Sequence, residues 1–177
     1  MWAVNWPRNW DARPMSTSAS LVVGADGSTS KGGSSGGVST KADRSVFLDR
    51  RRNFDLILIG GNTARTEPYA TTPIPVVILS RSEVHAITNN PQAHFWRLSP
   101  SQALVRAREE FGPRILVEGG PALMRELLEA ELIDDFFLTV TEVQGGENAV
   151  DWQEILTHFV SVEKSEVDGT QFFHAHN

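Results

Sequence analysis

Three apolar runs, each ending in a polar or glycine-rich turn, dominate the hydrophobic pattern of the chain. They are DLILIGG at 55–61, IPVVILS at 74–80 and RILVEGG at 114–120. Continuous apolar runs of this length are typical of strands that are buried on both faces of a sheet. The pattern therefore predicts a central sheet whose strands lie inside the protein.

Segments with helical spacing separate these strands. They are STKADRSVFLDRRRN at 39–53, SPSQALVRAREEF at 99–111 and PALMRELLEAEL at 121–132. Ser39 or Thr40 can cap the first helix, with Asp43 near its first turn. Ser99 can cap the second helix, where Pro100 suits the first turn.

Further strands are expected at both ends of the chain. ASLVVGA at 19–25 is a buried strand candidate, and three more candidates lie at 134–143, 158–167 and 170–176. VDGT between the last two indicates a hairpin. The order β–α–β–β–α–β–α–β–β–β predicts an α/β fold. Its central sheet is mixed and mostly parallel, with helices on both faces and an antiparallel C-terminal hairpin.

Composition narrows the class of protein. The chain has 177 residues, no cysteine and a net charge of −6. We expect a cytoplasmic protein that binds neither nucleic acid nor a membrane, because the net charge is negative, no apolar run is long enough to span a bilayer and the first residues lack the apolar core of a signal peptide. Without thiolates, and with only a HAH pair near the end, no metal site is expected.

Two segments stand outside the alternating pattern. Residues 1–16 contain Trp2, Trp6 and Trp10, and we interpret them as an arm that packs onto the body or onto a second subunit. Residues 17–177 are expected to form one domain. Within it, DGSTSKGGSSGG at 26–37 lies between two structured elements and is interpreted as a mobile loop over a site.

The turns that follow the three apolar strands bring together candidate chemistry. Ligands of open α/β sheets bind at the carboxyl ends of strands, so the three ends suggest a shared cleft. Ser80, Arg81 and Ser82 suit a ribose phosphate, and the glycines of VEGGP offer bare N–H groups to an anion at a helix start. A tight strand-to-helix turn is the structural alternative for this last motif. No G-x-G-x-x-G fingerprint is present.

These motifs carry a family resemblance. The series ADGSTSKGGSSGGVST, ADRSVFLDRRRNFDLILIGGNTARTEPY, PVVILSRS and ILVEGGPALMRELLEAELIDDFFLTV resembles the reductase domain of riboflavin biosynthesis, in its single-domain actinobacterial form. The resemblance runs from about residue 18 to the C-terminus. It implies a dihydrofolate-reductase-like fold and a homodimer. It also implies reduction, by NADPH, of the ribosyl side chain of a ribosylaminopyrimidine 5′-phosphate to the ribityl form.

The resemblance also assigns roles to individual residues. Ser35, Arg51 and Glu118 match positions that bind the substrate, although Arg51 could equally be a solvated surface charge. Apart from the resemblance, the reaction needs a proton from water or from a nearby acid; Glu118 and Asp26 are the candidate catalytic acids, and Asp26 could instead be only a turn residue. The expected cofactor-binding residues, with Arg81 added because of its charge, are Gly60, Gly61, Thr63, Glu67, Ser80, Arg81, Gly119, Gly120, Pro121, Ala122 and Leu123.

Three features depart from the family pattern, and one of them is that an arginine of the bifunctional members has no counterpart in EPYATTPIP. Relatives often carry Lys or Asn where this chain has Ser20, and some carry Trp where it has Gly37. Two alternatives stay open: the first shares the same fold, and the departures favour the second. A dihydrofolate or other pterin reductase would need a carboxylate on the helix after the glycine-rich loop, for which Asp43 is the candidate. A catalytically silent NADP-binding protein would bind NADPH without turnover.

Overall fold

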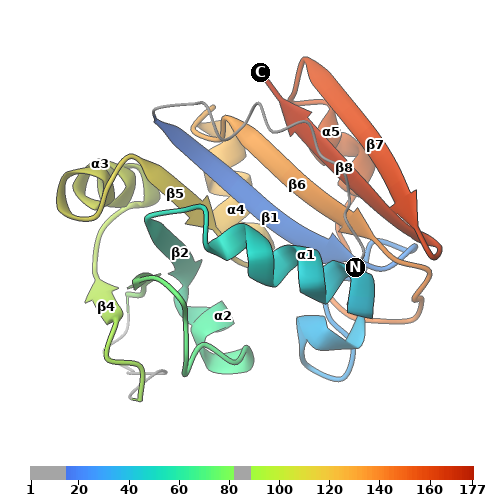
Figure 1. The fold of residues 1–177 in the computed structure, drawn as a ribbon, viewed down its shortest axis with the longest axis horizontal. Helices are drawn as coiled ribbons and strands as arrows, with labels where there is room; N and C mark the ends of the chain where they lie inside the picture. The colour runs from blue at the N-terminus through green and yellow to red at the C-terminus, as the bar shows by residue number, and fades with distance from the viewer. Residues whose placement is uncertain (1–14, 82–88) are drawn as a thin grey trace. The chain divides into compact units, whose positions relative to one another are not determined.

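The computed structural model describes residues 15–81 and 89–177 (Figure 1). The strands hydrogen-bond in the order β4-β3-β2-β5-β1-β6-β8-β7. Parallel pairs join β1 to β5, β5 to β2, β2 to β3 and β3 to β4, whereas β8 pairs antiparallel with both β6 and β7. The predicted mixed, mostly parallel sheet with an antiparallel C-terminal hairpin is confirmed.

The chain divides into two compact units, and β1 contributes to both. The first unit comprises Ser20–Arg50 and Asp135–Asn177, and the second comprises residues 15–19 and Arg51–Asp134. The predicted arm lies outside the described residues, except for Met15 and for Ser16, which begins β1. Among the described residues, no helix combines the length and hydropathy that crossing a membrane requires.

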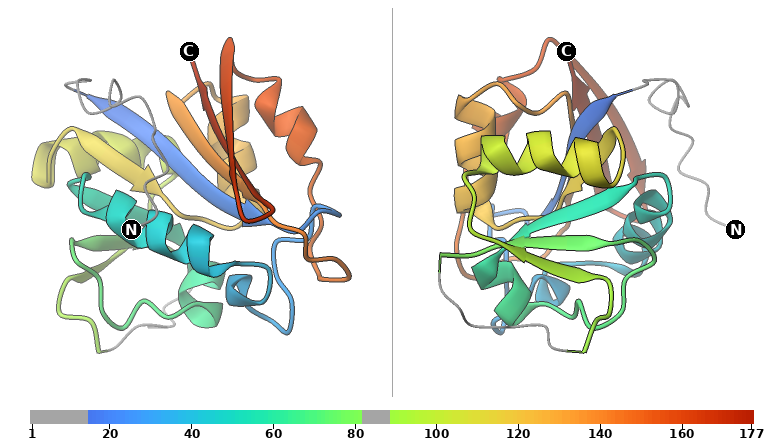
Figure 2. Two further views of the ribbon diagram at one scale, coloured as in Figure 1. Left: turned by 45° about the vertical axis from the view of Figure 1, so that its right-hand side comes forward. Right: turned by 90° about the vertical axis from the view of Figure 1, so that its left-hand side faces the viewer.

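The second unit contains most of the parallel strands. Its elements are β2 (Leu56–Gly60), α2 (Gly61–Thr66), β3 (Val76–Leu79), β4 (Ala93–Trp96), α3 (Pro100–Glu110), β5 (Arg114–Val117) and α4 (Pro121–Glu129). Ile57 and Ile59 of β2 pack with Val76 and Ile78 of β3 and with Ala64 of α2 in a buried cluster. Helix α3 contacts both β5 and α4 (Figure 2).

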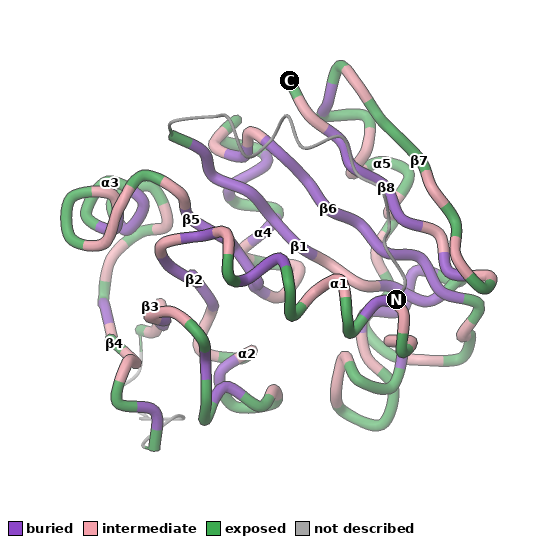
Figure 3. Tube along the Cα trace, in the orientation of Figure 1, coloured by how far each residue is buried: buried purple, intermediate pink, exposed green. Residues whose placement is uncertain are grey.

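The first unit contains the antiparallel strands. Its elements are the second half of β1 (Ser16–Val23), the short helix η2 (Ser35–Gly37), α1 (Lys41–Arg51) up to Arg50, β6 (Asp135–Val140), α5 (Trp152–Leu156), β7 (Ser161–Val167) and β8 (Thr170–His176). Strand β6 is buried along its whole length, whereas β7 at the edge is not (Figure 3).

Successive side chains of the antiparallel strands point to opposite faces, and each face has its own helix. On one face, the guanidinium of Arg50 in α1 lies 4.1 Å from the centre of the Phe137 ring in β6. On the other face, Trp152 of α5 packs against Phe173 of β8 at 5.5 Å between ring centres. In this unit the predicted helices on both faces of the sheet are therefore present.

Local sequence signals explain most of the element ends. Ser99 and Gln102 form a capping box at the start of α3, as the Ser99 cap predicted. The Thr40 hydroxyl accepts a hydrogen bond from the backbone N–H of Asp43, which identifies Thr40 as the cap of α1. At the predicted β7–β8 hairpin, Asp168 and Gly169 both have positive φ, as a type I′ turn requires.

The sequence pattern missed four elements and one strand start. It did not predict α2, β4, α5 or η2, which contain only three to six residues. It also began the first strand at residue 19, although β1 starts at Ser16. Ser16, Thr17 and Ser18 are buried, so a strand with a polar sequence lies inside the fold.

Candidate active site

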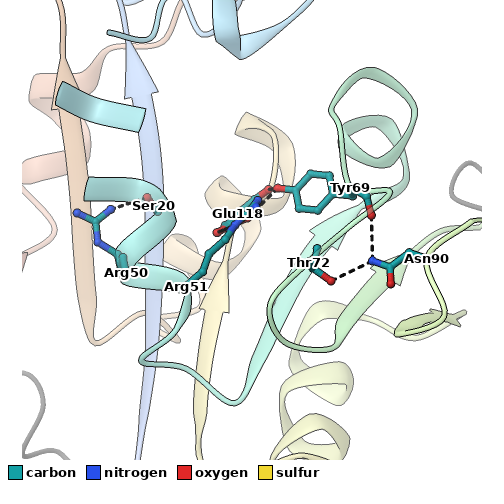
Figure 4. Close-up of polar contacts among 7 residues, drawn as sticks. All are labelled: Ser20, Arg50, Arg51, Tyr69, Thr72, Asn90 and Glu118. Atoms are coloured by element: carbon teal, nitrogen blue, oxygen red, sulfur yellow. Dashed lines mark hydrogen bonds and ion pairs between the residues drawn. The ribbon is translucent and has the colours of Figure 1, made fainter. Parts of the chain in front are cut away.

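Glu118, directly after β5, forms a buried ion pair with Arg51 at the end of α1 (Figure 4). Arg51 donates from Nε to Oε1 at 2.9 Å and from Nη2 to Oε2 at 2.7 Å. The side chain of Arg51 is only 5% exposed, and that of Glu118 only 3%. Bidentate geometry of this kind makes the strongest hydrogen bonds between a guanidinium and a carboxylate. The structure thus brings together two of the predicted substrate-binding residues, and Arg51 is not a solvated surface charge.

Tyr69 completes this buried group. Its hydroxyl donates to Oε2 of Glu118 at 2.9 Å, and its ring lies 5.1 Å from the guanidinium carbon of Arg51. Burial, together with the charge of Glu118, raises the pKa of the Tyr69 phenol well above its usual value. The phenol therefore stays protonated and acts as a donor to the carboxylate.

The charge of Arg51 is balanced inside the protein. Burial disfavours the charged guanidinium, but the hydrogen bonds and charge of Glu118 outweigh burial and raise the pKa of Arg51 above its usual value. A phosphate bound to Arg51 would place a second anion beside Glu118. The geometry consequently suits uncharged donors, such as hydroxyl or N–H groups, better than a phosphate.

Asn90 fixes the loop that carries Tyr69. Its side-chain nitrogen donates to the carbonyl oxygen of Tyr69 and to the hydroxyl of Thr72, both at 2.9 Å (Figure 4). Its side-chain oxygen accepts from the backbone N–H of Gln92 at 2.9 Å. Both hydrogens and the oxygen of this buried amide are thus engaged.

The three predicted strand ends lie at one edge of the second unit. In the parallel pairing, Gly60 at the end of β2 lies opposite Leu79 at the end of β3. The Ser80 hydroxyl stands 2.9 Å from where a Cβ on Gly61 would sit, so a larger residue at 61 would have to displace it. The Thr63 hydroxyl lies 3.5 Å from the corresponding point on Gly120. These turns therefore adjoin one another, as predicted.

Two of these glycines have space around them. Apart from its chain neighbours, a Cβ on Gly60 would meet no atom of the described residues within 4 Å, and one on Gly120 would meet only Thr63. Gly120 is the N-cap residue of α4, and no side chain caps this N-terminus. Internal packing thus does not explain these glycines, whereas a ligand that approaches the backbone would.

The remaining predicted cofactor residues are in the same unit. Arg81 is exposed directly after Ser80, and the backbone N–H of Glu67 ends α2 by donating to the carbonyl of Thr63. Gly119 is buried, and Pro121, Ala122 and Leu123 form the first turn of α4. Ser82 lies outside the described residues.

Asp26 belongs to the first unit, where its carboxylate supports a turn. Oδ1 accepts from the hydroxyl of Ser28 at 2.7 Å, and Oδ2 accepts from the backbone N–H of Gly145 at 2.7 Å. These hydrogen bonds, that of Ser28 first, lower the pKa of Asp26 to about 2. Since a proton donor at neutral pH must hold a proton, the geometry favours the turn interpretation over the predicted catalytic role.

The glycine-rich segment is hydrogen-bonded to residues 143–150 in the same unit. Backbone bonds join Thr29 and Ser30 to Glu147. Ser35 begins the short helix η2, with Ser34 as its cap. At Gly37, where relatives can carry Trp, a Cβ would collide with the carbonyl oxygen of Lys31. The departure at this position therefore has a steric cause.

Ser20, the other residue that departs from the family pattern, is hydrogen-bonded to Arg50. Nη1 of Arg50 donates to the Ser20 hydroxyl at 2.8 Å, and both residues are buried (Figure 4). Asp43, the carboxylate that a pterin reductase would use, is buried as well, and it accepts a hydrogen bond from the Ser39 hydroxyl at 2.5 Å. Asp43 thus stabilises the start of α1 through this hydrogen bond.

Sequence reasoning gave no role to Tyr69, Asn90 or Arg50. Tyr69 ends the run ADRSVFLDRRRNFDLILIGGNTARTEPY and is the only tyrosine of the chain. That singularity was the one available signal. Nothing in the sequence around Asn90 or Arg50 distinguishes them from other surface-type residues. No group of three His, Asp or Glu side chains in the described ranges could hold a metal ion.

Solved structures with this fold share little sequence with the chain. A deaminase/5-amino-6-(5-phosphoribosylamino)uracil reductase from Thermotoga maritima superposes with a TM-score of 0.65 at 15% identity, over 96% of this chain and 58% of that one. A pyrimidine reductase-like protein from Corynebacterium diphtheriae gives 0.64 at 16% identity, over 97% and 94%. Dihydrofolate reductase from Enterococcus faecalis, solved with NADP(H), gives 0.66 at 14% identity, over 91% and 95%.

The chain thus spans little more than half of the bifunctional protein from Thermotoga maritima. The likeness confirms the dihydrofolate-reductase-like fold. None of the curated proteins matches the sequence. A family model does match, and it covers residues 18–170 under the description RibD C-terminal domain. Because this match includes most of the chain, the protein belongs to the RibD C-terminal domain family.

Proposed function

We propose that the protein is an NADPH-dependent reductase of riboflavin biosynthesis. It would convert the ribosyl side chain of a ribosylaminopyrimidine 5′-phosphate to the ribityl form. The observation that carries this proposal is the family match over residues 18–170. The adjoining strand ends of the second unit support it, because they offer backbone and hydroxyl groups where the resemblance expects the cofactor.

The residues at those strand ends fit a dinucleotide. Open space at Gly60 and Gly120 would admit phosphate oxygens close to the backbone, and the uncapped N-terminus of α4 favours an anion. Ser80 and the exposed Arg81 would hold the ribose end with its 2′-phosphate. When bound, NADPH would supply the hydride.

The protein's own task in such a reaction is to position groups. Hydride transfer needs reacting carbons held within ~3–3.5 Å of each other and protected from water. Glu118, paired with Arg51 and Tyr69, would fix the sugar or the pyrimidine through an uncharged donor. We infer no proton transfer through Glu118, since its carboxylate already accepts hydrogen bonds from both neighbours.

The test is NADPH oxidation, followed at 340 nm, with two ribosylaminopyrimidine phosphates that differ in the ring amine. The proposal is supported if NADPH reduces either pyrimidine and does not reduce dihydrofolate. Turnover of dihydrofolate would favour the pterin alternative. Tight binding of NADPH without turnover of any substrate would identify a silent NADP-binding protein.

A further inference from the structure

Tyr69 links two parts of the second unit that are far apart in sequence. Its hydroxyl contacts Glu118 at the end of β5, and its carbonyl oxygen is held by Asn90 before β4. The residue is buried within the cluster that includes Ile57 and Ile59 of β2. Its ring position is therefore set by packing, and its hydroxyl can point in only a narrow range of directions.

The two oxygens of Glu118 differ in how they are used. Oε2 accepts from Tyr69 at 2.9 Å and from Nη2 of Arg51 at 2.7 Å. In the described part of the chain, Oε1 accepts one hydrogen bond, from Nε of Arg51 at 2.9 Å. A carboxylate oxygen can accept two, so Oε1 keeps the capacity for a second donor.

We propose that Tyr69 is a positioning residue of the proposed reductase site. Its hydroxyl anchors Oε2 of Glu118, so that Oε1 is presented to a hydroxyl or N–H donor of the pyrimidine substrate. This proposal rests on the proposed function and adds to it a residue that acts through Glu118. Without the Tyr69 hydroxyl, Oε2 would itself compete for the donor and the carboxylate could rotate.

The chemistry of this buried group is consistent with the proposal. Arg51 balances the carboxylate charge, so a neutral donor that reaches Oε1 forms a charge-assisted hydrogen bond with little competition from water. A donor of this type also costs less to bury than an anion does beside the same carboxylate.

The experiment compares Tyr69→Phe with Thr72→Val. Thr72 is buried in the same loop and its hydroxyl accepts from Asn90, so its variant removes one hydrogen bond and leaves the bonds of Tyr69 to Asn90 and Glu118 in place. For Tyr69→Phe we expect kcat/KM for the pyrimidine to fall about tenfold, as for loss of a hydrogen bond to a charged group. The KM for NADPH should not change. Thr72→Val should lower the melting temperature and keep kcat/KM within about twofold of wild type.

A second measurement uses the fact that Tyr69 is the only tyrosine. With ring-labelled tyrosine, NMR of the wild-type protein gives the signals of this one side chain. Saturation with the pyrimidine substrate should shift these signals if a donor joins Glu118. This measurement applies even where Tyr69→Phe does not fold.

The outcomes separate the two proposals. Absence of wild-type turnover overturns the proposed function, and the role of Tyr69 with it. Wild-type turnover combined with a Tyr69→Phe variant as active as Thr72→Val overturns the role of Tyr69 alone. Unchanged tyrosine signals on saturation with a substrate that is turned over would do the same.

Discussion

Arg51 and Glu118, 67 positions apart in the chain, meet in a two-point ion pair with almost no exposure to solvent. The pair joins the end of α1 to the end of β5. Removing one member of such a pair leaves an uncompensated buried charge, whereas replacing both members removes the charge and its cost together.

Glu118→Gln should therefore destabilise the protein. We expect its free energy of unfolding to fall by about 3 kcal/mol, because Arg51 keeps its charge without a counterion. The double variant Arg51→Met with Glu118→Met should recover at least half of that loss. Urea denaturation measures both. Wild-type stability combined with a turnover loss of 10²–10⁴-fold would instead identify Glu118 as a proton donor.

The preference for NADPH over NADH should depend on Arg81. This exposed residue follows Ser80 at the end of β3, where the 2′-phosphate of NADPH is expected. Arg81→Ala should weaken NADPH binding by ~1.5–3 kcal/mol and leave NADH binding nearly unchanged. Arg106→Ala, which removes a surface pair with Glu110, is the matched control and should affect neither cofactor. Equal losses for both cofactors would contradict the assignment.

Tyr69 should make the protein sensitive to alkali. Its phenol pKa is raised in the folded state, so above pH ~10 the unfolded chain releases this proton while the native protein retains it. The stability advantage of the phenol is full below pH 10 and declines as the pH rises further, by about 1.4 kcal/mol per pH unit. Tyr69→Phe should lack this extra slope in urea denaturation between pH 9 and 11. Parallel pH profiles of the two proteins would contradict the raised pKa of the Tyr69 phenol.

Asp26 should matter for stability rather than for turnover. Its pKa of about 2 means that the ionised carboxylate supports the turn above pH ~4, and that this support fades as the pH falls through 2. Asp26→Asn should melt at a lower temperature at pH 7 and retain kcat. The difference in melting temperature from wild type should shrink on acidification. A loss of kcat with unchanged melting would restore the catalytic interpretation.

Assembly is predicted from the first residues of the chain. Three tryptophans at 2, 6 and 10 would expose a large apolar surface unless they are covered, so we expect a homodimer in which residues 1–16 contribute to the contact. Light scattering of the full chain and of a version without these residues tests this. If both the full chain and the shortened version have the mass of a single chain, the prediction is wrong.

The strands were predictable where the residues are apolar. LILIG and RILV are recognisable as strands from their hydrophobicity alone, since burial on both faces requires hydrophobic side chains throughout. The first three residues of β1 were not predicted as strand because Ser and Thr usually indicate loops. In the fold, the Thr17 hydroxyl accepts from Arg108 at 2.7 Å, and its backbone N–H donates to Asp134. Only the tertiary structure supplies such partners.

The candidate site likewise contains contacts that the sequence predicts and contacts that it does not. The meeting of Gly61 with Ser80 follows from a general rule about the ends of parallel strands, so it could be inferred from the sequence. The contact of Tyr69 with Glu118 spans 49 positions and depends on the path of an irregular loop. No periodicity encodes such a path. The pairing of Arg51 with Glu118 was missed for a related reason, because each was assigned to a ligand rather than to the other.

The hydroxyl-rich start of β1 has a consequence for how the protein is made. During synthesis this strand leaves the ribosome about a hundred residues before its partner β5. A hydrophobic strand waiting that long would expose an adhesive edge to other nascent chains. Ser16, Thr17 and Ser18 remain well hydrated instead, and they gain nothing from burial until β5, Arg108 and Asp134 exist. We therefore expect the polar start of β1 to reduce aggregation of the nascent chain.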